Sequence, residues 1–241
     1  MSDVGCWLLD VGCRKVDDRE IKTSISAQPD KIKKQEYAMK IICIGRNYAE
    51  HAKELNNAVP TEPVYFMKPD SALLTRNKPF FYPDFTKDLH YECEIVLRIN
   101  KVGKCINEKF ALSYIDAIGV GIDFTARDLQ QKAKEKGLPW EKAKAFDFSA
   151  PISSFIPVVE FEDMQQIDFS LKKNGETVQY GNTKDMIFSY SAIIAYVSQF
   201  MTLKTGDYIF TGTPAGVGPV AIGDKLEAFI GEKKMLTVNI K

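Results

Sequence analysis

The chain has 241 residues and carries 32 basic and 32 acidic side chains, so its formal net charge is zero. This balance argues against a general nucleic-acid-binding protein, because such proteins are normally basic. A hydrophobic content of 45% and a charged content of 27% are typical of a folded globular protein. No apolar stretch approaches the roughly 20 residues that span a bilayer. The two histidines exclude a three-histidine zinc site within one chain.

The cysteines predict a reducing compartment. Their number, five, is odd, and none of them forms a C-x-x-C pair, which is typical of free thiols in a cytoplasmic protein. Asp3 and Asp10 interrupt the apolar run at the N-terminus, so the pattern of a secretory signal peptide is absent. We therefore expect a cytoplasmic protein whose partners include neither nucleic acid nor a membrane.

Residues 1–38 differ in composition from the rest of the chain. The stretch 14–36 is polar and lacks a sustained hydrophobic period, whereas Met39 opens the strand-like run MKIICIG. We predict an N-terminal extension over residues 1–38, poorly ordered or loosely attached, and a catalytic domain over residues 39–241. The alternative is a packed N-terminal hairpin around Trp7.

The remaining chain predicts a β-rich α+β protein with few helices. An Asn-Gly pair marks the turn of a hairpin between two of the strands. The strands are expected at 41–44, 64–67, 91–99, 117–124, 168–173, 176–180, 207–211, 226–230 and 236–240. Helices are expected at 48–55, 110–115, 126–136 and 186–201, with Gly137 and Pro139 closing the third.

The segment HYECE places acids on one face of a strand. Alternate residues of a strand point the same way, so His90, Glu92 and Glu94 share a side. Two carboxylates about 7 Å apart on a buried face raise each other's pKa unless a cation lies between them. The pattern therefore indicates a metal site, either with both glutamates or as a His-Glu-Glu triad. The alternative is a solvated strand face that carries acids.

Asp123 ends an apolar strand just before a helix. Such strand ends often carry active-site residues, although Asp is also a preferred helix N-cap. Together with Glu92 and Glu94, Asp123 can supply three oxygen ligands. Hard carboxylate oxygens suit Mg²⁺, Mn²⁺ or Ca²⁺ better than zinc.

His51 and Glu54 are three residues apart on a predicted helix and are therefore neighbours on one face. A carboxylate beside an imidazole orients the ring and raises its basicity, as a general base requires. The alternative is an ordinary exposed helical pair. His51 is not part of an H-E-x-x-H motif, so a zinc-protease interpretation fails.

Two further segments carry possible substrate contacts. In WEKAKAF, Lys144 either belongs to a solvated face or is directed at an enolate or carboxylate. The glycine-rich segment from Phe210 to Pro219 lacks the Gly-Lys-Ser/Thr of a phosphate-binding loop. Its backbone amides and the Thr213 hydroxyl would instead approach a small anionic substrate.

Taken together, these segments resemble the fumarylacetoacetate hydrolase family, most closely its acylpyruvase and oxaloacetate decarboxylase-like members. The motifs appear in the order GRNYAEHAKE, HYECE, IDFTARDLQ, KGLPWEKAKAFD and TGTPAGVGP, and the resemblance covers residues 39–241. It implies the mixed β-roll or barrel of that family, with few helices, in a protein that is usually dimeric.

The resemblance also implies roles for nine residues. Their shared property is a match to the family's motifs: Glu92, Glu94 and Asp123 as metal ligands, His51 and Glu54 as a lid-helix dyad, Lys144 as the active-site lysine, Gln130 and Thr213 as substrate or metal-water contacts, and Arg46 as an anion-binding residue. In this pattern Asp123 replaces His90 as the third ligand, and His90 becomes a neighbour of the metal.

The function implied is a divalent-metal-dependent hydrolase that cleaves a C–C bond in acylpyruvates such as fumarylpyruvate or acetylpyruvate through an enolate. We expect Mg²⁺, with Mn²⁺ or Ca²⁺ as alternatives, a small 2-oxo acid substrate and a homodimer. His51 would deprotonate the attacking water, and Lys144 would stabilise the developing charge. The alternatives are an oxaloacetate decarboxylase, a 2-hydroxyhepta-2,4-diene-1,7-dioate isomerase and a non-enzymatic metal-binding module.

Overall fold

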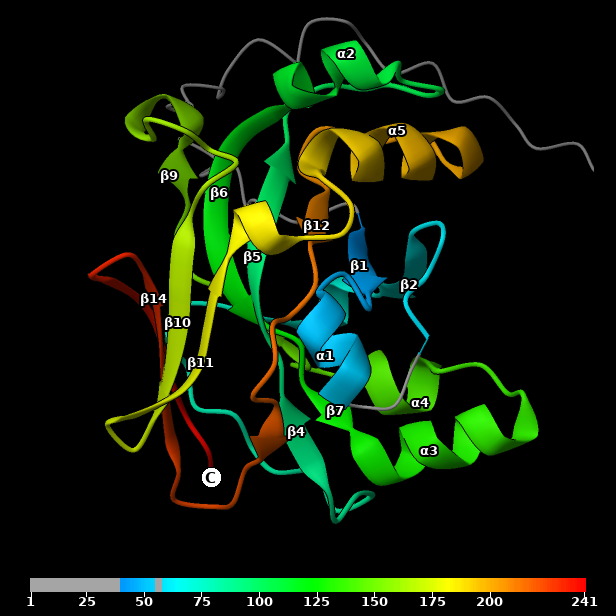
Figure 1. The fold of residues 1–241 in the computed structure, drawn as a ribbon. Coiled ribbons are helices and arrows are strands. Elements are labelled where there is room, and N and C mark those ends of the chain that lie inside the picture. Colours follow the sequence, from blue (N-terminus) through cyan, green and yellow to red (C-terminus); the bar gives the residue numbers. More distant parts are fainter. Residues whose placement is uncertain (1–39, 55–57) are drawn as a thin grey trace, which may run out of the picture. The chain divides into compact units, whose positions relative to one another are not determined.

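The computed structural model describes residues 40–54 and 58–241 (Figure 1). The chain divides into two units between Gln35 and Glu36, and everything described here lies in the second unit. The predicted extension, the alternative hairpin around Trp7 and the predicted last residue of the first helix all lie outside the described residues. The domain boundary stays a prediction.

The central element is a mixed six-stranded sheet. β1 pairs with β12 in parallel, and the other neighbouring strands are antiparallel. The strands run from edge to edge as β2 (Val64–Lys68), β1 (Ile41–Gly45), β12 (Tyr208–Phe210), β5 (Cys93–Ile99), β6 (Ile115–Ile122) and β9 (Ile156–Pro157).

Both faces of this sheet are buried, which explains the uninterrupted apolar runs in its sequence. In β1, Ile42 and Ile44 pack into the larger hydrophobic cluster, whereas Ile41 and Cys43 pack into a smaller cluster on the opposite face. Val96 of β5 also belongs to the smaller cluster. Since strand residues alternate between the faces, Glu94 points to the same side as Val96, toward that smaller cluster.

Three smaller sheets surround the central one. The first has the order β11 (Glu176–Asn182), β10 (Asp168–Lys173), β14 (Lys225–Ile230) and β15 (Lys233–Asn239), the second β13 (Gly218–Pro219), β4 (Leu89–Tyr91) and β7 (Thr125–Ala126), and the third β3 (Leu73–Leu74) and β8 (Ala150–Pro151). The predicted hairpin is confirmed, with Asn174 and Gly175 at positive φ in the turn between β10 and β11. The described sheets remain open and form no closed barrel.

The described helices are short and lie at two ends of the sheet. Figure 1 shows α2 and α5 together at one end, with α3 and α4 at the other, near α1. They are α1 (Ala49–Glu54), α2 (Glu108–Ala111), α3 (Arg127–Lys136), α4 (Glu141–Lys144) and α5 (Tyr190–Phe200), with single 3₁₀ turns η1 (Asp70–Ala72), η2 (Leu112–Tyr114), η3 (Val158–Glu160) and η4 (Thr183–Asp185). None of these helices is long and apolar enough to cross a membrane.

Some predicted boundaries shift for local reasons. The predicted helix at 186–201 begins only at Tyr190, because the Ser189 side chain accepts a hydrogen bond from the Ala192 amide and caps it. The predicted helix at 110–115 is α2 followed by η2, and it gives way to β6 at Ile115. α3 ends as predicted at Gly137, whose φ of 61° suits glycine.

Candidate active site

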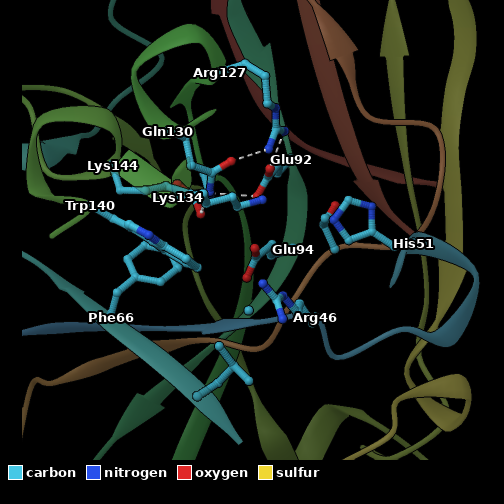
Figure 2. A pocket seen from close by; sticks show the side chains of 14 residues that line it. Arg46, His51, Phe66, Glu92, Glu94, Arg127, Gln130, Lys134, Trp140 and Lys144 are labelled. Carbon is cyan, nitrogen blue, oxygen red and sulfur yellow. Dashed lines mark hydrogen bonds and ion pairs between the residues drawn. The ribbon is translucent and has the colours of Figure 1, made fainter. Parts of the chain in front are cut away.

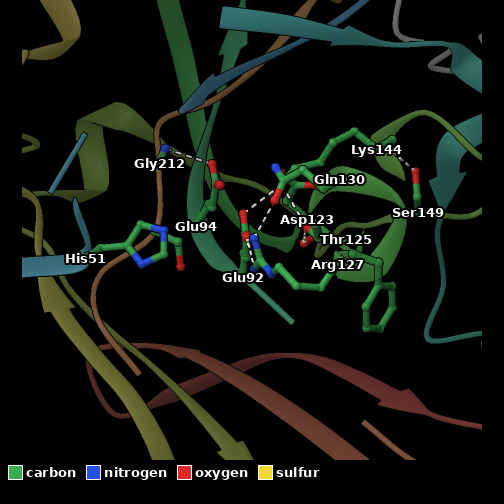
Figure 3. A network of polar contacts seen from close by, with 12 residues as sticks. His51, Glu92, Glu94, Asp123, Thr125, Arg127, Gln130, Lys144, Ser149 and Gly212 are labelled. Carbon is green, nitrogen blue, oxygen red and sulfur yellow. Dashed lines mark hydrogen bonds and ion pairs between the residues drawn. The ribbon is translucent and has the colours of Figure 1, made fainter. Parts of the chain in front are cut away.

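Three buried carboxylates converge where β5 and β6 meet. We call Glu92, Glu94 and Asp123 the carboxylate cluster; each offers an oxygen that lies within 4.8 Å of the others. The β5–β6 register explains this convergence, because Cys93 pairs with Ile122 and the next residue of β6 therefore emerges beside Glu92. The Asp123 amide donates to the Glu92 carbonyl at 2.8 Å. The predicted trio thus comes together in space (Figure 3).

The prediction of one continuous strand from 91 to 99 is wrong at one residue. The strand is interrupted at Glu92, because β4 leaves the central sheet and pairs with β7 and β13 instead. His90 lies in β4, and its Nε2 is 2.9 Å from an Asp88 oxygen. His90 is therefore outside the carboxylate cluster, and no His-Glu-Glu triad forms. Burial, followed by the nearby Arg127 charge, lowers the pKa of His90.

Glu92 is held between two cations. Lys144 Nζ donates to one of its oxygens at 2.8 Å, and Arg127 Nη2 donates to the other at 2.6 Å. Burial alone raises the pKa of Glu92, but Lys144 and then Arg127 outweigh it and hold that pKa well below the usual range. In the same way, burial lowers the pKa of Lys144, and Asp123 with Glu92 overcomes it and raises that pKa. Both groups are therefore charged near neutral pH.

Asp123 has two lysine partners. Lys144 Nζ donates to one oxygen at 2.6 Å, and Lys68 Nζ lies 2.8 Å from the other. Lys68 is only 1% exposed and also donates to Ser149 Oγ at 2.9 Å. Sequence reasoning missed Lys68, although a lysine that directly follows an apolar strand residue was an available signal. Lys68 thus fixes the position of the Asp123 carboxylate from the side opposite to Lys144.

Glu94 differs from its two neighbours in its charge environment. Its one polar contact is a 2.7 Å hydrogen bond donated by the Gly212 amide, and in the described part of the chain no basic side chain forms an ion pair with it. Burial, reinforced by Asp123 and Glu92, raises the pKa of Glu94 well above its ordinary value. Glu94 is only 2% exposed and lies beside two other carboxylates without a counter-charge of its own. The three carboxylates together therefore form a fitting ligand set for a hard divalent cation.

A cavity opens onto the carboxylate cluster, and eight of the nine predicted site residues line it. The ninth, Glu54, lies behind His51. Figure 2 shows the basic and aromatic side chains that complete the wall. The lining residues are Ile44, Gly45, Arg46, His51, Phe66, Glu92, Glu94, Asp123, Arg127, Gln130, Lys134, Trp140, Lys144 and Thr213.

The opposite wall is helix α1. His51 is buried, and its Nδ1 is 3.1 Å from a Glu54 oxygen. Glu54 is fixed in turn by the Gly216 amide, which donates to it at 3.1 Å. With Nδ1 on Glu54, the Nε2 atom of His51 is the ring nitrogen that remains for a substrate. The predicted pair therefore has a buried imidazole, a partly exposed carboxylate and a third supporting group, as a supported general base requires.

Two of the predicted substrate-contact residues already use part of their hydrogen-bonding capacity within the protein. The Thr213 hydroxyl donates to the Cys93 carbonyl and accepts from Gln179 Nε2, each at 2.8 Å. Gln130 Oε1 accepts from Arg127 Nη1 at 2.7 Å, which leaves its NH₂ group for a ligand. Gln179, which sequence reasoning missed, is buried and ties the loop to β5 through the Cys93 amide.

Gly212 allows the glycine-rich loop to approach β1. Its φ is 101°, and a Cβ there would lie 2.7 Å from the Asn47 Cβ atom. Asn47 Nδ2 in turn donates to the Thr211 carbonyl at 2.8 Å. The Gly212 amide is directed at Glu94, so this loop positions a carboxylate, and only its remaining groups can face a substrate.

Comparison with known proteins identifies the family to which the chain belongs. The family described as fumarylacetoacetate (FAA) hydrolase C-terminal matches residues 40–241. The chain belongs to the fumarylacetoacetate hydrolase family, as its sequence motifs predicted.

Individual relatives are similar over most of their length. The mitochondrial oxaloacetate tautomerase FAHD1 of Arabidopsis thaliana is 49% identical over 191 residues, which cover 79% of this chain and 86% of that protein. The oxaloacetate tautomerase YcgM of Escherichia coli strain K12 is 47% identical over 188 residues, covering 78% and 86%. A crystal structure of fumarylpyruvate hydrolase from Pseudomonas aeruginosa with Mn²⁺ and pyruvate superposes with a TM-score of 0.81 at 36% identity, covering 84% of this chain and 89% of that one.

Proposed function

We propose that this protein is a divalent-metal-dependent enzyme that interconverts the keto and enol forms of a small 2-oxo acid, with oxaloacetate as its substrate. The observation that carries the proposal is the buried carboxylate cluster facing the His51–Glu54 pair across one cavity. The relatives named as oxaloacetate tautomerases support the choice of substrate. Enolisation needs charge stabilisation at an oxygen and a base at the adjacent carbon, and these two walls offer both.

The residues that would hold the metal are Glu92, Glu94 and Asp123. The bound cation supplies Lewis-acid stabilisation of negative charge on a substrate oxygen. We propose Mg²⁺, since its preferred ligands are carboxylate oxygens. Mn²⁺ shares this preference, and the Pseudomonas aeruginosa structure contains it.

The other residues handle charge and protons. His51 takes the proton from the carbon beside the keto group through Nε2, and Glu54 stabilises the resulting imidazolium through Nδ1. The enolate oxygen takes a proton from water to complete the enol, and the imidazolium returns its proton to water. Lys144, kept protonated by Asp123 and Glu92, places a positive charge next to the oxygen that becomes negative. The free NH₂ group of Gln130 can donate a hydrogen bond to the substrate carboxylate.

A second candidate is the hydrolysis of acylpyruvates that the sequence predicts. The built His51–Glu54 pair favours it, because an imidazole with a supporting carboxylate can deprotonate water as well as carbon. The similarity to a fumarylpyruvate hydrolase points the same way. Decarboxylation of oxaloacetate and isomerisation of an unsaturated 2-oxo diacid would use the same enolate-stabilising groups. The homodimer and the cytoplasmic location stay predictions.

One experiment separates these functions. The protein is stripped with EDTA, reloaded with Mg²⁺ or Mn²⁺, and incubated separately with oxaloacetate, fumarylpyruvate and acetylpyruvate. Loss of the enol absorbance of oxaloacetate without loss of carbon supports the tautomerase, release of pyruvate plus an acid supports the hydrolase, and release of CO₂ supports the decarboxylase. Full activity in EDTA contradicts a metal-dependent mechanism. Turnover of none of the substrates favours a binding module.

A further inference from the structure

Two of the four lysine and arginine side chains that line the cavity have no carboxylate partner. Arg127 and Lys144 are committed to the carboxylate cluster through ion pairs of 2.6–2.8 Å. Arg46 and Lys134 form no ion pair or hydrogen bond with any of the residues that the structure describes, and both face the cavity (Figure 2). Cations placed in a cavity wall without an anion indicate that the anion comes with the ligand.

Lys134 is placed by the geometry of α3. Arg127, Gln130 and Lys134 are spaced three and four residues apart, so they share one face of the helix, and all three line the cavity. Lys134 Nζ lies 5.9 Å from the centre of the Trp140 ring, which holds the ammonium over an aromatic face. Burial, followed by the charges of Arg127 and Arg46, lowers the pKa of Lys134. Among the described residues, no carboxylate forms an ion pair with Lys134 that would offset these effects.

Arg46 reaches the cavity from the opposite side. It directly follows β1 in a turn with a φ of 59°, a strained value for an arginine. In Figure 2 its guanidinium points into the cavity near Glu94, without an ion pair between them. Arg46 and Lys134 therefore line the same cavity from two different segments of the chain, the turn after β1 and helix α3.

We propose that Arg46 and Lys134 together bind a second carboxylate of the substrate, so that the site selects 2-oxo dicarboxylates over 2-oxo monocarboxylates. This inference rests on the proposed function and names the residues that set its specificity. The charges agree with it: four lysine and arginine side chains and a divalent cation against three carboxylates leave three positive charges around the cavity. Such a cavity favours a dianion over a monoanion.

The test compares two ligands that differ only in the second carboxylate. Oxaloacetate carries it, and 2-oxobutyrate has a methyl group in its place. For the Mg²⁺-loaded protein, deuterium exchange at C3 is followed by NMR, and kcat/KM is obtained for each ligand. We expect Lys134→Gln to reduce the preference for oxaloacetate about tenfold or more, the usual effect of losing a hydrogen bond between charged groups.

Three further variants sharpen the result. Lys134→Arg keeps the charge and is expected to keep most of the preference. Arg46→Gln should reduce the preference for oxaloacetate as Lys134→Gln does. In the double variant the preference should fall by less than the product of the two single fold-changes, because both residues bind the same group. Lys132→Gln, exposed on the same helix, should retain the wild-type preference.

The inference fails if Lys134→Gln slows both ligands equally, since Lys134 then has only a general electrostatic or structural role. It also fails if the wild type shows no preference for oxaloacetate. If the wild type exchanges neither ligand, the proposed function is wrong, and calorimetric titration of the same two compounds then tests the selectivity separately. A binding preference for oxaloacetate that Lys134→Gln abolishes would still support the inference.

Discussion

The two walls of the cavity are built in different ways. The wall made by β5 and β6 holds three buried carboxylates, two of them locked by Lys144, Arg127 and Lys68. The wall made by α1 holds the His51–Glu54 contact, supported by the Gly216 amide, and the Glu54 side chain is 33% exposed. The first wall keeps its charges in a dry environment, whereas the second is in contact with solvent at Glu54. The difference separates the proposed cation site from the proposed general base and gives each wall its own test.

The largest expected effect comes from the first wall. Asp123→Ala removes a proposed ligand and leaves Lys68 and Lys144 without their shared carboxylate. We expect loss of Mn²⁺ binding by calorimetry and a fall in turnover of about a thousandfold or more, since a metal contributes several kcal/mol to charge stabilisation. Asp116→Asn is the control, because Asp116 lies in β6, the strand that Asp123 follows, but pairs with Arg98 near the surface. Unchanged Mn²⁺ affinity in Asp123→Ala would rule out this ligand set.

On the second wall, His51→Ala should lower kcat by about 10²–10⁴-fold, the usual contribution of a general base, while Mn²⁺ affinity stays within a few-fold. Glu54→Gln should produce a smaller loss, because the ring remains but its orientation and charge support weaken. Lys53→Ala, which breaks an exposed pair with Glu50 on the same helix, serves as the control. A wild-type kcat in His51→Ala would refute the assignment of the base.

Lys68→Met tests whether the first wall needs its buried cations. Removing one partner of a buried ion pair typically costs about 3–5 kcal/mol, and we expect the lower end here because Asp123 keeps Lys144. The free energy of unfolding of the metal-free protein, measured in urea, should fall accordingly. Adding Mn²⁺ should recover part of the loss. Equal losses with and without Mn²⁺ would show that Lys68 acts on the fold alone.

The smallest expected effect is a change in the stability of the metal-free protein, and its sign differs between Glu94 and Glu92. The raised pKa of Glu94 means that the folded state holds its proton more tightly than the unfolded chain. Metal-free stability therefore decreases as pH rises from the ordinary value of 4.5 toward the raised pKa, and the cost persists above it. Glu94→Gln removes this cost and should stabilise the metal-free protein at pH 7 by about 1–3 kcal/mol.

Glu92→Gln is the matched comparison. The pKa of Glu92 is lowered, so its ionised form stabilises the fold above its ordinary pKa, and that stability is lost as pH falls through the lowered value. Glu92→Gln should therefore destabilise the metal-free protein at pH 7. Urea unfolding from pH 5 to 8 measures both variants. Changes of the same sign would show that the two carboxylates do not differ in charge compensation.

Much of the local structure was predictable because it depends on short-range rules. The hairpin at Asn174-Gly175 follows from positive φ in a two-residue turn, and the end of α3 follows from Gly137. The helical spacing of His51 and Glu54 places them in contact whatever surrounds them. Residue spacing alone left Glu92 and Glu94 open between a metal pair and a solvated face; the family resemblance selected the metal site and its third ligand.

The sequence by itself determined most of the longer strands and helices, which residues alternate to one strand face and which family the motifs match. Only the tertiary structure decided that β4 leaves the sheet with His90, that Lys68 pairs with Asp123, and that Glu94 alone of the cluster has no cationic partner among the described residues. These are contacts between residues distant in sequence, and their strength depends on burial. Local sequence patterns encode neither the long-range contacts nor the burial, because the same lysine or glutamate is ordinary at a surface and decisive in a dry interior.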